Sequence, residues 1–145
     1  MATFQISTYD AGHFRGVELL WREAFPDDPP WNAAHISIPA KLAVQPDALL
    51  VALDGHQVIG SIMAGYDGHR GWLYALAVLT SHQRRGAGHA LVHEAEERLL
   101  SMGCRKVNLQ VRASNLGVVA FYERLGYRAE ERVSMGKHLH ATPRA

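Results

Sequence analysis

The sequence predicts an α/β fold in which a mixed, twisted sheet is flanked by helices. Two strand-like stretches, Leu49–Leu53 and Gln57–Gly65, are joined by Asp54-Gly55, a dipeptide that favours a tight hairpin. From Trp72 onward the pattern changes to strand, helix, strand, which is the order of a parallel crossover. A chain of 145 residues is long enough to bury a sizeable core, and we expect residues 1–145 to form a single domain.

Composition and charge are those of an ordinary soluble globular protein. The chain is 48% hydrophobic and 20% charged, and its formal net charge of +1 gives no reason to expect nucleic acid or an anionic membrane as partner. Cys104 is the single cysteine, so no internal disulfide can form, which suits a reducing compartment. The first residues lack a leader pattern, and no apolar run has the length of a membrane span. We therefore expect a cytoplasmic protein.

The stretch before the hairpin predicts one short strand and two helices. Phe4–Thr8 alternates as a strand, and Asp10 is a good N-cap for a helix that runs to about Ala24. The apolar face of this helix consists of residues three and four apart: Phe14, Val17, Leu20, Trp21 and Ala24. The helix ends before Pro26, because the residue that precedes a proline is pushed out of the α region. A less regular helix is expected over Ala33–Ala43.

The strand–helix–strand unit of the second half begins at an apolar run, Trp72–Leu79. The next element, His89–Met102, is an amphipathic helix whose apolar residues recur at four-residue intervals, and Gly103 follows it as the C′ residue. Lys106–Val111 alternates as the following strand. Because a helix separates the two strands, we expect them to run parallel.

A further helix and strand are expected in the last part of the chain. Asn115 caps an amphipathic helix over Leu116–Leu125, which Gly126 closes. Ala129–Met135 has the pattern of a final strand, and His138–Ala145 that of a tail.

The junction between the Trp72–Leu79 strand and the following helix has the features of an anion site. It reads Gln83-Arg84-Arg85-Gly86-Ala87-Gly88, with two glycines that let a phosphate approach the backbone and two arginines that add positive charge. The first turn of the next helix presents unpaired N–H groups and the positive end of the helix dipole. The dinucleotide fingerprint requires a third glycine, and Leu91 stands in its place. A glycine turn without a ligand is the alternative.

A second motif follows in the last third of the chain. It consists of Val111-Arg112-Ala113-Ser114-Asn115 and then Phe121-Tyr122-Glu123-Arg124-Leu125-Gly126-Tyr127. With the loop at Gln83–Gly88 before it, the pair of motifs resembles the GNAT superfamily of N-acetyltransferases, most closely from Trp72 to Tyr127. The resemblance implies the GNAT (acyl-CoA N-acyltransferase) fold and acetyl-CoA as co-substrate.

The resemblance also implies a role for each matching residue. The backbone of Leu76, Ala77 and Val78 would pair with the pantetheine arm, along a strand that is bulged in family members. The amides that would bind the pyrophosphate are those of Arg84, Arg85, Gly86, Ala87, Gly88 and His89. Asn115 would contact the pantetheine or acyl region, and Tyr122 would protonate the departing thiolate. The alternatives are a helix cap alone for Asn115 and a packed ring with a satisfied hydroxyl for Tyr122.

The resemblance does not supply the general base that would deprotonate the acceptor amine. The Val111–Asn115 run is similar to that of the protein N-terminal acetyltransferases, which have a Glu two residues before the arginine; here that position is Gln110, which cannot take a proton. Chemistry alone leaves a water chain or one of three side chains, Asp67, His69 or Glu23.

The expected function is transfer of an acetyl group from acetyl-CoA to a primary amine, of a small molecule or a protein N-terminus, by direct attack. A catalytically silent acyl-CoA sensor on the same fold is the alternative. His89 and His93 stand one helical turn apart without an evident third ligand, so no metal is expected. The identity of the acceptor, the acyl-chain length and the oligomeric state stay open, a homodimer included.

Overall fold

The computed structural model describes residues 4–140, which group into two compact units with the boundary after Gln110. The tail predicted at His138–Ala145 lies outside the described residues from residue 141 onward. Among residues 4–140, no helix combines the length and the hydropathy that crossing a bilayer requires.

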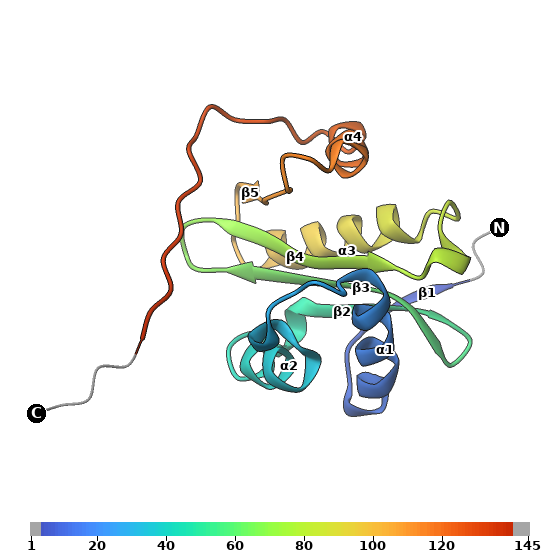
Figure 1. The fold of residues 1–145 in the computed structure, drawn as a ribbon. Helices are drawn as coiled ribbons and strands as arrows, with labels where there is room; N and C mark the ends of the chain where they lie inside the picture. The colour runs from blue at the N-terminus through green and yellow to red at the C-terminus, as the bar shows by residue number, and fades with distance from the viewer. Residues whose placement is uncertain (1–3, 141–145) are drawn as a thin grey trace, which may run out of the picture. The chain divides into compact units, whose positions relative to one another are not determined.

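The first unit is built on a five-stranded sheet whose strands lie in sequence order (Figure 1). The strands are β1 (Gln5–Thr8), β2 (Leu49–Asp54), β3 (Gln57–Tyr66), β4 (Gly71–Val78) and β5 (Val107–Asn108). The first four pair antiparallel, as the predicted meander requires. The pair of β4 and β5 is parallel, which confirms the predicted crossover, although β5 keeps only two residues of the strand expected over Lys106–Val111.

Helices cover both faces of this sheet (Figure 1). The helices of one face are α1 (Phe14–Ala24) and α2 (Ala34–Leu42), and α3 (Ala87–Ser101) covers the other. Short 3₁₀ turns connect the elements: η1 (Ala11–His13), η2 (Pro30–Asn32), η3 (Pro46–Ala48) and η4 (Thr80–His82). The predicted cap at Asp10 is confirmed, but it caps η1, and the α-helix begins at Phe14.

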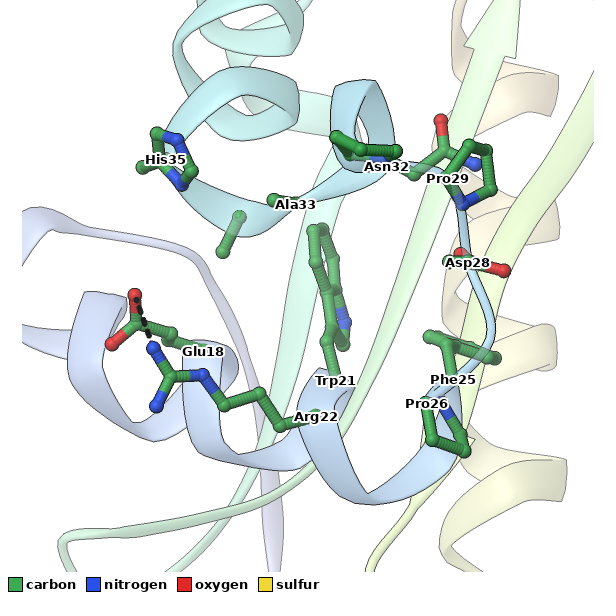
Figure 2. Close-up of a pocket in the computed structure, with 12 residues that line it drawn as sticks. Glu18, Trp21, Arg22, Phe25, Pro26, Asp28, Pro29, Asn32, Ala33 and His35 are labelled. Carbon is green, nitrogen blue, oxygen red and sulfur yellow. Dashed lines mark ion pairs between the residues drawn. The ribbon is translucent and has the colours of Figure 1, made fainter.

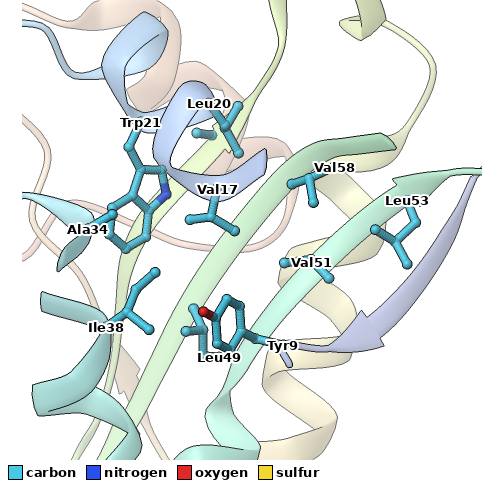
Figure 3. Packing of buried hydrophobic residues seen from close by; sticks show 11 residues of the cluster. Tyr9, Val17, Leu20, Trp21, Ala34, Ile38, Leu49, Val51, Leu53 and Val58 are labelled. Atoms are coloured by element: carbon cyan, nitrogen blue, oxygen red, sulfur yellow. The ribbon is translucent and has the colours of Figure 1, made fainter. Parts of the chain in front are cut away.

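The strand β2 is buried on both faces, which explains its continuous apolar sequence. Leu49, Val51 and Leu53 belong to a cluster with residues of α1 and α2 (Figure 3). The alternate residues Leu50 and Ala52 are also fully buried and are not part of that cluster. Because successive side chains of a strand point to opposite faces, these two lie on the α3 side.

The second unit contains one helix, α4 (Leu116–Arg124), within residues 111–140. Asn115 caps it through its side chain, and Gly126 follows it with a positive φ of 95°, so both predicted ends are confirmed. The predicted final strand at Ala129–Met135 is wrong, because these residues have no strand pairing in the structure. Val133 and Met135 are largely exposed, and a strand without a neighbour has no ladder to stabilise it.

Candidate active site

The strand β4 carries a bulge in its middle. Ser61 of β3 pairs with Ala77 and Met63 pairs with Tyr74, so two residues of β4, Ala75 and Leu76, stand opposite the single residue between them. Ala75 has a φ of 52°, in the left-handed region that non-glycine residues rarely adopt. The bulge that the family resemblance implied is therefore present in this chain.

The bulge changes which face of the sheet the side chains of β4 point to. Before it, a Cβ on Gly71 would meet Cys104 and Leu99, on the α3 side. After it, Ala77 belongs to the cluster under α1 and α2. The inserted residue thus reverses the alternation of the strand, and Leu76 lies at the point of reversal.

The edge of β4 that faces away from β3 has a strand partner only at its beginning. Among the residues of the first unit, β5 pairs with Gly71 and Trp72 and with nothing beyond them. The amide of Leu79 donates to Ile59 on the β3 side, so alternation directs the backbone groups of Val78 to the opposite edge. The carbonyl of Val78 already accepts from the Gln83 side chain, with 3.2 Å between Nε2 and O.

The turn after β4 is fixed to the body of the unit from two sides. The Glu23 carboxylate of α1 accepts a hydrogen bond from the Thr80 amide at 3.0 Å. The His82 ring contacts Asp54 of the β2–β3 hairpin, with 3.1 Å between Nε2 and Oδ2. These contacts hold the start of the loop that leads to α3.

The loop itself presents backbone N–H groups and positive charge. Arg84 and Gly86 have φ values of 64° and 86°, which bend the chain sharply before α3. No side chain within the described residues caps the start of α3 at Gly86. The amides of Ala87, Gly88 and His89 in the first turn therefore have no intrahelical acceptor. The side chains of Arg84 and Arg85 are exposed, and the other predicted residues are Gly86 and the first turn of α3.

A cavity of about 340 Å³ lies between α1 and α2 (Figure 2). The Trp21 indole stands at its centre, with Phe25 and Ala33 beside it, and the Glu18–Arg22 ion pair lies at one side. This volume is at the small end of the range for small-molecule sites.

Two of the three candidate bases, Asp67 and His69, lie in one turn, and Glu23 lies at the other end of β4. Asp67 lies in the β3–β4 turn, where the amides of Arg70 and His69 donate to its carboxylate and hold its pKa below the ordinary value. That turn precedes β4, so it is roughly 16 Å of extended chain from Leu76. Glu23 is engaged by Thr80 at the other end of the strand.

In the second unit, Tyr122 lies near the end of α4, where main-chain hydrogen bonds close the helix. The amide of Tyr127 donates to the Tyr122 carbonyl and that of Gly126 to Glu123, the two bonds of a Schellman motif. The Tyr127 ring packs edge-on against the Tyr122 ring at 5.5 Å. Burial raises the pKa of Tyr122 to about 12, so the phenol keeps its proton throughout the neutral range. The Asn115 side chain accepts from the Val118 amide, so its capping role is realised.

Two residues near the bulge, Trp21 and Ser61, were not predicted from the sequence as site residues. The Trp21 indole donates to the Ser61 hydroxyl at 2.8 Å, and that hydroxyl donates to the Ala75 carbonyl at 2.9 Å. The signal was present, since Ser61 is a lone hydroxyl within the apolar strand Gln57–Gly65.

Among residues 4–140, no group of three or more His, Cys, Asp or Glu side chains is arranged to hold a metal.

Comparison with known proteins gives a consistent result. The model of the acetyltransferase (GNAT) family matches residues 14–127. A protein named acetyltransferase from Sodalis glossinidius (strain morsitans) is 44% identical over 136 residues, which cover 93% of this chain and 95% of the relative. One with the same name from Yersinia pestis (strain Pestoides F) is 38% identical over 137 residues, with the same coverage.

A solved structure shares the fold. The structure of AAC(6′)-Iy in complex with the bisubstrate analogue CoA-S-monomethyl-acetylneamine superposes with a TM-score of 0.78 at 20% identity, over 94% of this chain and 99% of that chain. At this identity the likeness shows the fold alone. The family match covers more than half of the chain, and the relatives that it resembles over nearly their whole length bear the name of the same activity. The chain therefore belongs to the acetyltransferase (GNAT) family and is an N-acetyltransferase.

Proposed function

We propose that this protein transfers an acetyl group from acetyl-CoA to a primary amine, of a small molecule or a protein N-terminus, by direct attack of the amine. The observation that carries the proposal is one continuous stretch of chain. The bulged and open edge of β4 leads through an arginine–glycine turn into the uncapped start of α3. A thioester with a long polar arm and a diphosphate would use these features in this order: the open strand edge for the arm, and then the turn and the helix start for the diphosphate.

The proposed binding mode uses main-chain groups. The backbone of Leu76, Ala77 and Val78 would pair with the pantetheine arm as an added strand does. The pyrophosphate would be bound by the amides of Arg84, Arg85, Gly86, Ala87, Gly88 and His89. The neighbour AAC(6′)-Iy was solved with an analogue that contains CoA, which supports the same co-substrate here. Asn115 would contact the pantetheine or acyl region.

The proposed chemistry forms one bond and breaks another. The amine nitrogen bonds to the carbonyl carbon, and the carbon–sulfur bond breaks. A backbone amide at the bulge, that of Leu76, would stabilise the negative charge on the carbonyl oxygen. Tyr122 would give its proton to the departing thiolate and would recover a proton from water. Its raised pKa keeps the phenol protonated at neutral pH before the transfer.

The acceptor must lose a proton as well, since an amine with a pKa of about 10.4 is mostly charged at neutral pH. Glu23 and Asp67 are engaged by backbone amides at the two ends of β4, and His69 lies with Asp67 in the β3–β4 turn. We therefore propose that the proton leaves to water. The cavity between α1 and α2 is the site that we propose for the acceptor, because its central residue, Trp21, is hydrogen-bonded through Ser61 to the bulge.

We further propose that residues 1–145 act as one domain. The family model runs from residue 14 to residue 127 and so crosses the boundary after Gln110. A single family model that matches residues of both units supports their acting as one domain.

A thiol-release assay tests the proposed function. Purified protein is mixed with acetyl-CoA and, separately, with a polyamine, an aminoglycoside, free amino acids and peptides with a free N-terminus. We expect release of CoA thiol with at least one amine, and calorimetry should show binding of CoA without an acceptor. Binding of CoA without turnover on any amine would favour the acyl-CoA sensor, and no binding of CoA would overturn the proposal.

A further inference from the structure

Ser61 stands out as the only buried polar side chain among the described residues. It is fully buried in the middle of β3, and it is hydrogen-bonded on both sides. Its hydroxyl accepts from the indole Nε1 of Trp21 and donates to the carbonyl of Ala75. Trp21 is itself only 6% exposed.

The chain of hydrogen bonds from Trp21 through Ser61 ends at the peptide group between Ala75 and Leu76. The bulge removes this peptide group from the regular β-ladder. Ala75 and Leu76 are the two residues of β4 that oppose one residue of β3. In a regular strand the ladder would fix the direction of this peptide group, but at a bulge the extra residue is left unpaired. Here the carbonyl of Ala75 is fixed by Ser61 instead.

The direction of that carbonyl determines the direction of the next amide. The carbonyl of Ala75 and the N–H of Leu76 belong to one peptide plane, and in a trans peptide the two point in opposite directions. No cis peptide bond occurs among the described residues. Since the carbonyl points to Ser61 on the α1 side of the sheet, the Leu76 N–H points away from that side.

We infer that Ser61, held by Trp21, is a positioning residue for catalysis: it fixes the bulge peptide so that the Leu76 amide faces the thioester carbonyl. This inference rests on the proposed function. Preorganised donors stabilise a developing oxyanion because they need no reorientation during the reaction. Without the hydroxyl, the Ala75–Leu76 peptide can rotate, and the amide is aligned in only part of the molecules.

The first test is Ser61→Ala. Loss of one oxyanion donor lowers kcat roughly 10²–10³-fold, and we expect misalignment of the donor to lower kcat about tenfold or more. The dissociation constant of CoA should change less than about twofold, because CoA has no acyl carbonyl. A ketone analogue of acetyl-CoA, with methylene in place of sulfur, should lose its affinity advantage over CoA in Ser61→Ala. A role confined to folding would not alter that ratio.

The matched control is Ile38→Val, which removes one buried methyl group of α2 from the same cluster as Trp21. It should keep both kcat and the affinity ratio. If Ser61→Ala does not fold, Ser61→Cys keeps the size of the side chain with a weaker donor, and kcat should fall less. The inference is overturned if a folded Ser61 variant keeps the wild-type kcat and affinity ratio, or if the control loses them equally.

The failure of this inference is distinguishable from failure of the proposed function. If the wild-type protein binds CoA and acetylates an amine, and Ser61→Ala does so at the same rate, only the positioning role is rejected. Wild-type protein that binds no CoA rejects both. Trp21→Phe is the less direct test, because Trp21 also lines the cavity proposed for the acceptor and its loss should raise the KM of the amine.

Discussion

The Glu23 carboxylate at the end of α1 accepts a hydrogen bond from the Thr80 amide, with 3.0 Å between Oε2 and N. This bond links the first helix to the turn that precedes the arginine–glycine loop. Glu23 is a tether in this geometry, whereas the sequence left it open as a general base.

Substitution of Glu23 distinguishes its role as a hydrogen-bond acceptor for Thr80 from a role as general base. Glu23→Ala removes one acceptor, worth about 1 kcal/mol for a typical hydrogen bond, so we expect the affinity for CoA to fall about fivefold with little change in kcat. Glu23→Gln keeps the acceptor and should behave as wild type. Titration calorimetry and steady-state rates measure both quantities, and a Glu23→Gln variant with a kcat reduced a hundredfold would instead identify a base.

Tyr122 allows a prediction about pH. Burial raises its pKa to about 12, so the phenol remains protonated, and able to donate, as the pH rises through the range in which enzymes are assayed. We expect Tyr122→Phe to lower kcat roughly 10²–10⁴-fold, with the affinity for CoA unchanged. The ratio of wild-type to variant kcat should be flat from about pH 6 to pH 10.

A phenol with an ordinary pKa near 10 would begin to ionise within that range. The ratio would then decline toward one at the alkaline end, which would contradict a buried Tyr122. Tyr127→Leu is a useful companion variant, because the Tyr127 ring packs against Tyr122 without being proposed to donate a proton. It should lower kcat less than Tyr122→Phe.

Two glycines offer a matched pair of alanine substitutions. Gly86 precedes α3 with a φ of 86°, and Gly117 lies in the first turn of α4; an added Cβ meets no atom within 4 Å at either. Steric contact is therefore equal, and only backbone conformation differs. We expect Gly86→Ala to lower the free energy of unfolding by about 1–2 kcal/mol, and Gly117→Ala to raise it by up to about 0.5 kcal/mol. Urea unfolding measures both, and equal effects would contradict the left-handed turn.

Much of the fold could be predicted because local pattern and tertiary structure agree. The Asp54-Gly55 hairpin, the apolar face of α1 and the glycines after α3 and α4 each have a physical cause that lies within a few residues. The strand expected at Ala129–Met135 failed for the opposite reason. A strand is stabilised by its neighbours, and the alternation of side chains cannot supply a pairing partner.

The bulge could not be predicted from local pattern either. Ala75 has a left-handed conformation without being glycine or asparagine, so no residue type marks the position. Its carbonyl accepts a hydrogen bond from the Ser61 hydroxyl, which comes from a different strand. The residues that shape the site therefore depend on contacts between segments, whereas the loop at Gln83–Gly88 is visible as a motif.

The conformation of Ala75 gives the final prediction. Glycine relieves the strain of a φ of 52°, roughly 1 kcal/mol for an L-residue, but it loses more entropy on folding, so Ala75→Gly should change the free energy of unfolding by less than about 0.5 kcal/mol. Valine is branched at Cβ and fits the left-handed region poorly, so Ala75→Val should cost more than about 2 kcal/mol. Urea unfolding of the pair checks the conformation, and a valine variant as stable as wild type would show that the bulge can be abandoned. Because glycine also loosens the peptide that carries the Leu76 amide, we expect Ala75→Gly to lower kcat severalfold while its stability stays that of wild type.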